Sequence, residues 1–589
     1  MKKVMALVMA ASMTAGVFAG CGSKNETSNN SSSNTTSTNN STEEKKEESN
    51  GPIVLRETGG KVETLNPHLS ASTAESDLHK YMTGNMLEMI LNEEGDNFEI
   101  VPFHAKALPT RSEDGLVWTF ELSEDAKFAD NTPITAETYE YSLKMLIDPK
   151  LLNIGAQSLM NDVTVLNANK YFKGECEWQD VGVKAIEGNK LQITLEYAVS
   201  EMDFLNLFTG GGNTAAVHPE IYETSFNEGR TENAYGTTFE TSPSSGAYTL
   251  TEWVRDQITK FEKNPESPLA DVYTPDIIES RVVEDATTML TLFKNGDTDY
   301  VSVSGANYDE YAEDPRLHIA DTTTVWYMYI NSESQENPVL CDNDFRQALY
   351  YAIDRKLIAE TVFKTAKPAP YYVADTKMAT PDMKYRDTEA AKAVIRPNKG
   401  HDPELAKEFF DKAYEANGNK KIEVEMMYFD SSDNMKLTTE YLEETYENLF
   451  GKDRLDIKLI ATPTQAVYEN MENGKFQIGF GGWSGGEFNP WATMVVHTSD
   501  YPAKHDRLRN KEYDELYNRT CKGDLIFETE ERIEALAKME EIIYAEMPMV
   551  PIWQAGSAKL FSDRITLKTE GEKSIPGVGF AILQADFAN

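Results

Sequence analysis

Cysteine and histidine are scarce in this chain. Its 589 residues include four cysteines and eight histidines, with no H-E-x-x-H pattern and no C-x-x-C pair. Because protein zinc sites use closely spaced Cys and His ligands, the sequence favours neither a structural nor a catalytic zinc site. Cys176, Cys341 and Cys521 are far apart, and their number is compatible with one disulfide or with three free thiols. We expect no metal and no other cofactor.

Basic residues are also in deficit. The chain has 56 Lys and Arg against 97 Asp and Glu, which gives a formal net charge of −41. Affinity for nucleic acid comes from Lys and Arg that face phosphates, so a nucleic-acid partner is excluded. An acidic body is also not attracted to an anionic membrane surface. Any attachment to a membrane must therefore come from a different part of the chain.

Long apolar runs are absent after the N-terminal segment, so no transmembrane helix is predicted there. The one apolar run, residues 4–20, follows two lysines and ends in F-A-G before Cys21. A short run of this kind, closed by small residues, is typical of a secretory signal peptide. A cysteine directly after the small pair resembles the lipobox of bacterial lipoproteins, although Phe18 stands where leucine is usual. An ordinary signal peptide with an incidental cysteine is the alternative.

We therefore expect a signal peptide over residues 1–20 and lipidation of Cys21, which anchors the protein on the extracytoplasmic side of the cell membrane. The following stretch, to residue 51, consists almost only of Ser, Asn, Thr, Glu and Lys. It cannot bury apolar surface, so residues 21–51 are predicted to form a disordered linker. A coil of about 30 residues spans roughly 30 Å. The sequence thus predicts a folded body on a flexible tether.

The folded body begins near Pro52 and is long for a single core, so two or three domains are expected. Trp118, Phe120 and Leu122 alternate with polar residues, as in a half-buried strand. Residues 345–353 show apolar side chains at helical spacing. Thr135 is predicted to cap a helix that starts at Ala136. Strands and helices mix along the chain, which predicts an α/β class.

A further helix is predicted over residues 75–91. Leu78, Met82, Met86 and Ile90 share one face at helical spacing, and the segment contains no proline.

Four segments resemble, in order and spacing, characteristic patterns of the extracytoplasmic solute-binding proteins of family 5. These proteins serve oligopeptide, dipeptide and nickel ABC importers. Asn131 and Glu137 replace the usual Gly and Asp in the first segment. The four patterns look structural, because they carry core residues. They are residues 118–142 (starting W-T-F-E-L), 246–250 (G-A-Y-T-L), 292–299 (L-F-K-N-G-D-T-D) and 344–355 (D-F-R-Q-A-L-Y-Y-A-I-D-R).

The resemblance implies an α/β fold of the periplasmic-binding-protein type II, with three lobes of which two close over a cleft by hinge motion. Lobe I would comprise residues 52–98, 240–322 and 556–589, lobe II residues 99–239, and lobe III residues 323–555. It also implies the function. The protein would be a monomeric, lipid-anchored subunit that captures oligopeptides and delivers them to an ABC permease and ATPase complex, without catalysing a reaction.

One segment resembles the loop that borders the cleft in the family's peptide binders. Residues 483–490, W-S-G-G-E-F-N-P, match the family pattern W-x-x-D-Y-x-D-P in part. The first Asp of that pattern can pair with the free amine of a peptide, but this chain has Gly486 there and Asn489 at the second Asp. Glu487 could replace it only if the backbone turned its side chain inward. The loop therefore predicts a peptide bound without a charged N-terminal anchor, or a different solute.

The resemblance also implies which residues face the ligand. An extended peptide can pair its backbone with two facing edges, one from lobe I and one from lobe III. Trp483 and Trp491 can supply flat apolar contacts, and a role in the core is the alternative for either ring. The predicted ligand-binding residues are Ser70, Ala71, Ser72, Thr73, Trp483, Ser484, Gly485, Gly486, Glu487, Phe488 and Trp491. No catalytic residue and no metal ligand is predicted.

Other functions remain open at this stage. The same fold could bind a nickel complex, haem or another small molecule, or could act as a peptide-pheromone receptor or an adhesin. A secreted serine hydrolase is a further alternative, because residues 482–486 match G-x-S-x-G with Ser484 as the nucleophile and His497 or His505 as the base. A hydrolase needs a helix directly after this serine. Asn489 and Pro490 interrupt such a helix.

Overall fold

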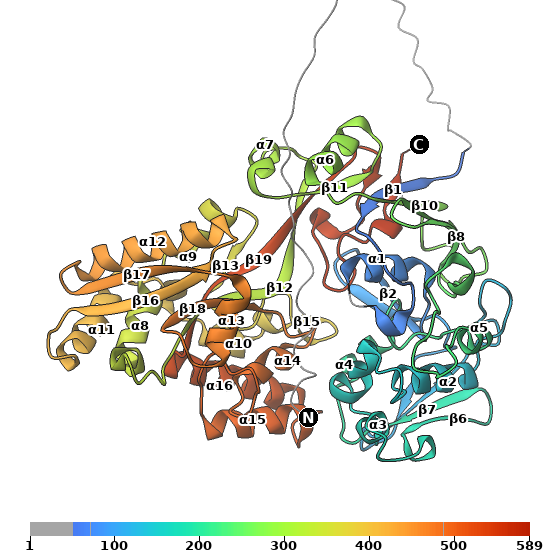
Figure 1. The fold of residues 1–589 in the computed structure, drawn as a ribbon, viewed down its shortest axis with the longest axis horizontal. Helices are drawn as coiled ribbons and strands as arrows, with labels where there is room; N and C mark the ends of the chain where they lie inside the picture. The colour runs from blue at the N-terminus through green and yellow to red at the C-terminus, as the bar shows by residue number, and fades with distance from the viewer. Residues whose placement is uncertain (1–50, 71, 487, 589) are drawn as a thin grey trace, which may run out of the picture. The chain divides into compact units, whose positions relative to one another are not determined.

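The computed structural model describes residues 51–70, 72–486 and 488–588 (Figure 1). The predicted signal peptide, Cys21 and all but the last residue of the predicted linker lie outside these ranges. Across the described residues, no helix combines the length and the apolar character that a bilayer crossing requires.

The largest sheet has seven strands and is mixed. β16 is parallel to β17 and to β18, and the pairs β18–β12, β12–β19 and β19–β11 are antiparallel. The short β13 pairs with β19. In spatial order the strands are β11 (Tyr300–Val303), β19 (Met549–Phe561), β12 (Leu317–Ile330), β18 (Ile478–Trp483), β16 (Ile422–Phe429) and β17 (Leu455–Thr462), with β13 (Lys367–Pro368) beside β19.

Among the described residues, the other strands form two four-stranded sheets and three two-stranded sheets. One sheet runs β1 (Val54–Gly59), β10 (Ile277–Val282), β9 (Ile258–Lys263) and β8 (Tyr248–Val254). The other runs β4 (Thr110–Arg111), β5 (Val117–Glu121), β7 (Lys190–Thr194) and β6 (Val183–Ile186). The pairs are β2 (Leu87–Leu91) with β3 (Phe98–Pro102), β14 (Met378–Thr380) with β15 (Met383–Lys384), and β20 (Ile565–Thr566) with β21 (Asp586–Phe587).

The α-helices lie between and beside these sheets. α8 packs against α11, α12 packs against β16 and β17, and α15 packs against α16. The helices are α1 (Thr73–Met82), α2 (Ala136–Leu146), α3 (Ala168–Phe172), α4 (Glu201–Leu207), α5 (Pro219–Thr224), α6 (Ala286–Asn295), α7 (Tyr308–Tyr311), α8 (Asn343–Ala352), α9 (Arg355–Ile358), α10 (Glu389–Val394), α11 (Pro403–Ala416), α12 (Asp433–Phe450), α13 (Thr464–Glu472), α14 (Pro490–Met494), α15 (Lys511–Lys522) and α16 (Thr529–Glu546).

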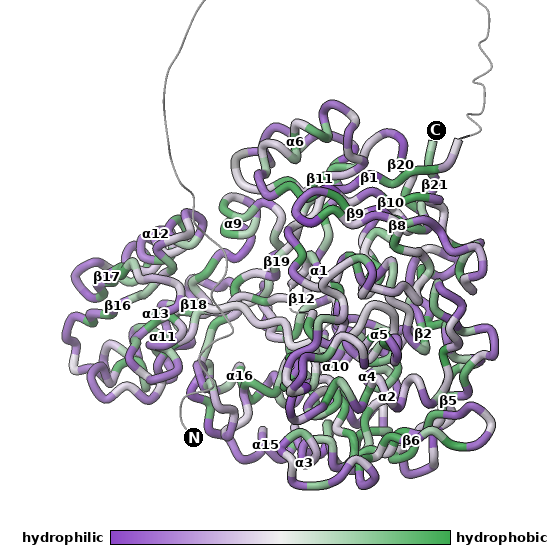
Figure 2. Tube along the Cα trace, turned by 45° about the vertical axis from the view of Figure 1, so that its right-hand side comes forward, coloured by the Kyte–Doolittle hydropathy of each residue, from purple (hydrophilic) through white to green (hydrophobic). Residues whose placement is uncertain are grey.

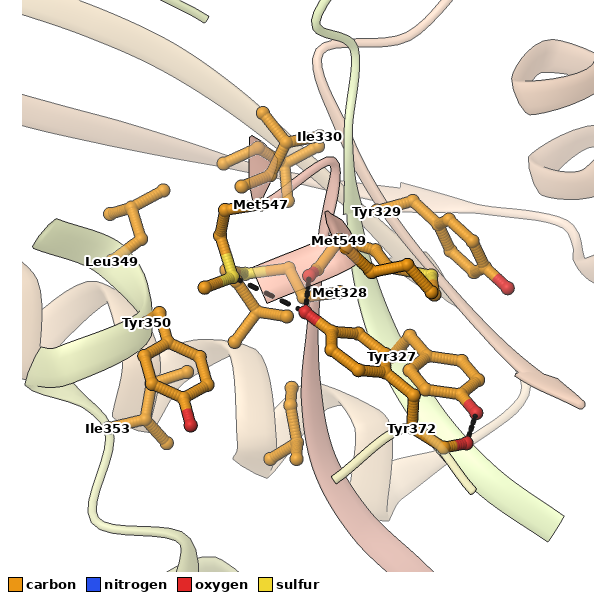
Figure 3. Packing of buried hydrophobic residues seen from close by; sticks show 14 of the residues in the cluster. Tyr327, Met328, Tyr329, Ile330, Leu349, Tyr350, Ile353, Tyr372, Met547 and Met549 are labelled. Carbon is orange, nitrogen blue, oxygen red and sulfur yellow. Dashed lines mark hydrogen bonds between the residues drawn. The ribbon is translucent and has the colours of Figure 1, made fainter. Parts of the chain in front are cut away.

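Three large groups of buried apolar side chains form the core. The first surrounds the seven-stranded sheet between Val325 and Trp553, the second lies around β5, β6 and β7, and the third lies around β1, β8 and β10. Figure 2 shows hydrophobic stretches around β5 and β6 and more hydrophilic loops outside them. In the first core the Tyr327 hydroxyl donates to the Tyr372 carbonyl at 2.6 Å, and the Tyr372 hydroxyl donates to the Met549 carbonyl at 3.1 Å (Figure 3). Buried hydroxyls are thus satisfied within the apolar packing.

Several local predictions are confirmed. Trp118 and Phe120 point inward from β5, where both are buried. The Thr135 side chain accepts the N–H of Thr138 at the start of α2. The apolar pattern from Phe345 forms α8, which ends at Ala352. These elements form as predicted because their apolar spacing and capping residues specify the same local structure.

The predicted helix over residues 75–91 is wrong in its second half. α1 ends at Met82, and the chain continues as β2 from Leu87. Between them the backbone is held by tertiary contacts. A Cβ on Gly84 would lie 2.5 Å from the Ser245 carbonyl oxygen, so only glycine fits there. The Asn85 side chain donates to the Thr209 carbonyl at 3.1 Å. Apolar spacing alone could not indicate this interruption, because both partners are distant in the sequence.

The boundaries between the three predicted lobes remain a prediction. Two long strands run through two of these boundaries, since β12 continues past residue 322 and β19 past residue 555. β12 and β19 run side by side in Figure 1. Their ladder is interrupted between Asp321 and Val325, where the Thr322 hydroxyl donates instead to the Ala555 carbonyl at 2.9 Å. One of the two irregularities in this pairing therefore lies at the place where the sequence predicts lobe I to meet lobe III.

A partly buried carboxyl on β2 predicts a pH-dependent stability. Burial raises the pKa of Glu88 to about 7, and one carboxylate oxygen accepts the Met89 N–H at 3.0 Å. Above this pKa the folded state carries a poorly solvated charge, whereas the unfolded carboxyl ionises near 4.5. We expect Glu88→Gln to raise the free energy of unfolding by about 1–2 kcal/mol near pH 8. The gain should shrink as the pH falls below 7 and disappear below about pH 4, where the carboxyl is protonated in both the folded and the unfolded state.

Urea denaturation of both proteins across this pH range measures the effect. Glu99→Gln on the neighbouring β3, where the side chain is exposed, is the matched control and should show no such trend. A gain for Glu88→Gln that is equal at both pH values would contradict the assignment.

Candidate ligand-binding site

An aromatic cavity lies where the parallel strands of the large sheet end. Its volume is about 270 Å³. β16 ends at Phe429 and is followed by Ser431 and Ser432, and β17 ends just before Thr464. Ligands of α/β proteins bind at the carboxyl ends of parallel strands, because loops and helix N-termini meet there. The aromatic residues that line the cavity are Trp326, Phe363, Phe429, Tyr468 and Trp553.

The aromatic rings form rigid walls. Trp326 and Trp553 stack with ring centroids 5.5 Å apart, and Phe363 stacks on Trp553 at 4.2 Å. Trp326 pairs across the sheet with Gly482, where a Cβ would lie 2.9 Å from the indole. Glycine at position 482 therefore lets the indole lie flat over β18. Stacked rings of this kind present apolar area with little conformational freedom to lose on binding.

The rim of the cavity is polar. The hydroxyls of Ser431 and Thr464 lie 3.2 Å apart. The Ser432 side chain accepts the N–H of Met435 and caps α12. The cavity thus combines an apolar interior with hydroxyl groups at its edge, which is the usual composition of a small-ligand site. Its volume suits one large apolar side chain rather than a whole peptide.

The predicted loop over residues 483–490 follows β18 directly. Gly485 and Gly486 both adopt left-handed backbone conformations, with φ of 53° and 60°. The Trp483 indole N–H donates to the Thr493 carbonyl at 3.1 Å, and the buried Lys377 ammonium donates to the carbonyls of Gly485 and Gly486. The loop is therefore held in place by contacts within the protein.

Two of the aromatic residues predicted to contact the ligand, Phe488 and Trp491, are buried in the structure. Phe488 is 3% exposed and lies against Phe98 with ring centroids 5.1 Å apart. Trp491 is 2% exposed, and the Arg532 guanidinium lies 3.7 Å from the centroid of its ring. Trp491 therefore lies in the core, which the sequence analysis gave as the alternative to a ligand contact. Trp483 is half-buried and is the ring of this loop that retains exposed surface.

The predicted ligand-binding edge of lobe I, residues 70–73, leads into helix α1. Ser72 is the N-cap of this helix and Thr73 is its first residue. The Ser72 hydroxyl accepts the Glu75 N–H at 3.2 Å, and the Glu75 carboxylate accepts the Ser72 N–H at 3.1 Å, which is a capping box for α1. Ser70 precedes this capping box. Ala71 and Glu487 lie outside the described residues. The role of all these positions in ligand binding stays a prediction.

The capping box predicts a local stability effect. We expect Ser72→Ala to lower the free energy of unfolding by about 1 kcal/mol, because the Glu75 N–H loses its acceptor. Ser70→Ala, two positions earlier and outside the box, should change it by less than about 0.5 kcal/mol. Urea denaturation of both variants tests this. Equal effects of the two substitutions would show that the cap is not the cause.

The surroundings of Ser484 do not match a hydrolase. α14 starts only at Pro490, with Asn489 as its cap, so no helix begins directly after the serine. His497 is buried and its Nδ1 lies 2.5 Å from the Asp506 carboxylate, while His505 packs against Tyr329 at 5.7 Å between centroids. An elbow without its helix cannot present a nucleophile or polarise an oxyanion hole.

The sequence did not single out the aromatic cavity. Its two tryptophans, Trp326 and Trp553, lie on β12 and β19, and their neighbourhood depends on strand pairing. In the structure Trp326 is half-buried inside an otherwise buried run, a difference that the sequence alone does not show. Cys176, Cys341 and Cys521 are free thiols in the structure.

Comparison with known proteins agrees with this fold. The dipeptide-binding protein DppE of Bacillus subtilis is 24% identical over 469 residues, which cover 79% of each chain. The periplasmic murein peptide-binding protein MppA of Escherichia coli is 25% identical, over 80% of this chain and 82% of that protein. The structure of the substrate-binding domain of an oligopeptide ABC transporter from Bacillus anthracis superposes with a TM-score of 0.64 at 21% identity, covering 92% of this chain and all of that one.

The structural likeness shows that the fold is that of the type II periplasmic binding proteins. A family model described as bacterial extracellular solute-binding proteins, family 5, middle region, matches residues 99–504, which is more than half of the chain. The protein therefore belongs to the bacterial extracellular solute-binding proteins of family 5, which bind solutes and are not enzymes.

Proposed function

We propose that this protein is the lipid-anchored substrate-binding subunit of an ABC importer and that it captures oligopeptides. The observation that carries the proposal is the aromatic cavity at the ends of β16 and β17, whose size suits one large peptide side chain. The named relatives bind dipeptides and murein peptides and are similar along most of their length. A peptide importer is thus the function that both the geometry and the relatives support.

In this proposal the peptide lies extended between two edges. Its backbone groups pair with the loop over residues 483–488 on lobe III and with residues 70–73 on lobe I, as an added strand would. One apolar side chain enters the aromatic cavity, and the remaining side chains meet water. The lobes close by bending at residues 322–324 of β12, where the ladder to β19 is interrupted.

In this proposal the N-terminal segment attaches the protein to the membrane. Lipidation of Cys21 would hold the protein on the extracytoplasmic face of the membrane, and the linker to residue 51 would let the body reach the permease and its ATPase. The acidic body carries no surface attraction to the bilayer, so the lipid alone provides the attachment. Intact mass of the protein extracted from membranes tests this, since a lipidated form is heavier by its acyl chains.

Native mass spectrometry of the purified protein, with nothing added, tests the ligand class. A ladder of bound masses spaced by amino-acid residue masses is the expected result. A single discrete mass would instead indicate a dedicated non-peptide solute, such as a metal complex or haem. A protein that stays empty, and also binds nothing from a tri- to pentapeptide library, would overturn the proposal.

A further inference from the structure

A phenylalanine of the loop between α15 and α16 rests on the turn between β4 and β5. Gly115 forms this turn with a left-handed φ of 70°, and a Cβ on it would lie 2.4 Å from the ring of Phe527. The Arg111 guanidinium covers the same ring at 4.3 Å from its centroid. Because Gly115 has no side chain, the tip of the ring fits into a notch at this turn. Phe527 belongs to predicted lobe III and the notch to predicted lobe II.

Two further contacts link the same two predicted lobes. The Asn489 amide donates to the Asp203 carboxylate at 2.8 Å. The Lys522 ammonium lies 5.3 Å from the centroid of the Tyr197 ring. In Figure 1, α4, which carries Asp203, lies below the long strands β12 and β19 that carry the predicted hinge. The three contacts therefore join the lobes at a place separate from the hinge.

These three contacts are suited to break and re-form. Phe527 remains 39% exposed, and the side chains of Arg111 and Lys522 are exposed as well. A cation over a partly exposed ring is a weak attraction, and a hydrogen bond that opens can be replaced by bonds to water. Junctions that hold two domains in one fixed position are large and apolar instead. The contacts can thus hold the lobes together reversibly.

We propose that Phe527, in its notch of Arg111 and Gly115, is a latch that holds predicted lobes II and III together in the empty protein, so that a ligand enters after the latch opens. The inference deepens the proposed function and rests on its hinge between the lobes. All three contacts are made between groups of the protein, so they stabilise the joined arrangement without a ligand. They therefore set the fraction of open molecules, and the apparent association rate of a ligand scales with that fraction.

Small-angle X-ray scattering of the purified protein, with nothing added, tests the latch itself. For Phe527→Ala we expect a larger radius of gyration than for the wild type, because more molecules are open. Arg111→Met, which removes the charge over the ring, should shift the radius in the same direction. The double variant should add little to Phe527→Ala, because both substitutions break one contact. Phe239→Ala is the matched control, since Phe239 is 43% exposed and takes no part in the three contacts, and it should leave the radius unchanged.

Stopped-flow tryptophan fluorescence with N-acetyl-Ala-Ala-Phe-Ala tests the effect on ligand entry. The probe is chosen because phenylalanine suits the aromatic cavity, whose wall includes Trp326 and Trp553. We expect Phe527→Ala to associate about 3- to 10-fold faster than the wild type, since loss of one such ring contact changes a two-state equilibrium by about this factor. Phe239→Ala should associate at the rate of the wild type.

The outcomes separate a latch from a contact that only adds stability. A lower melting temperature of Phe527→Ala, with the radius of gyration and the association rate of the wild type, would overturn the inference. So would a radius that increases equally in Phe527→Ala and Phe239→Ala. If the peptide does not bind the wild type, the failure counts against the proposed function, and the scattering of the empty variants still decides whether Phe527 holds the lobes together.

Discussion

Replacing Glu540 by leucine should lower the free energy of unfolding by about 3–5 kcal/mol, the largest stability loss that we expect from a single substitution. Glu540 is 0% exposed in the middle of α16 and is ion-paired with Arg386, whose side chain is 9% exposed. It also accepts the Tyr385 hydroxyl at 2.9 Å and the N–H groups of Tyr372 and Val373 at 3.2 and 3.3 Å. Removal of the carboxylate leaves a buried guanidinium and three further donors without this acceptor.

The neighbouring Glu541 provides the matched control. Its side chain is 48% exposed and pairs with Lys538 on the helix surface at 3.5 Å. Glu541→Leu should therefore change the unfolding free energy by less than about 1 kcal/mol. Removing both charges, in Glu540→Leu with Arg386→Met, should recover part of the loss, because no uncompensated charge then stays buried. Guanidinium denaturation measures all three variants. A loss below about 1 kcal/mol for Glu540→Leu would contradict this account.

Glu540 also matters for the candidate site. The segment that it holds, residues 372–386, includes Lys377 and the two strands β14 and β15. A variant that stays folded but loosens this segment should lose the fixed loop over residues 483–490 as well. Stability and ligand binding are thus coupled through one buried carboxylate.

Filling the aromatic cavity should produce the largest loss of binding. Ser431 lies at its rim and is exposed, so Ser431→Trp can place an indole in the opening without disturbing the core. We expect the affinity for N-acetyl-Ala-Ala-Phe-Ala to fall about 10- to 100-fold, which corresponds to losing the burial of one phenylalanine side chain. Titration calorimetry, with thermal melting to confirm the fold, measures the effect.

Two comparisons make this result specific. Ser302→Trp places the same side chain on an exposed position of β11, away from the residues that line the cavity, and should leave the affinity unchanged. The peptide with alanine in place of phenylalanine should lose little affinity when Ser431 is changed, because it has no ring to exclude. If both peptides lose affinity equally, the cavity does not receive the side chain.

Much of the local structure could be predicted from the sequence. β5, α2 and α8 form where apolar spacing and a capping residue agree, because each is specified within a few neighbouring residues. The predicted helix over residues 75–91 failed for the opposite reason. The close contact at Gly84 and the hydrogen bond of Asn85 involve partners more than a hundred residues away, and local periodicity carries no record of them.

The candidate site likewise combines features that the sequence predicts with features that only the tertiary structure shows. The amino-acid sequence by itself determined the family resemblance, the acidic charge that excludes nucleic acid, and the absence of a carboxylate at Gly486, since all three are properties of composition and order along the chain. Only the tertiary structure decided that Trp326, Phe363 and Trp553 enclose one cavity and that Lys377 lies behind Gly485 and Gly486. These contacts join residues separated by up to 227 positions. They arise from strand pairing and side-chain packing, which bring distant residues together without any local signal.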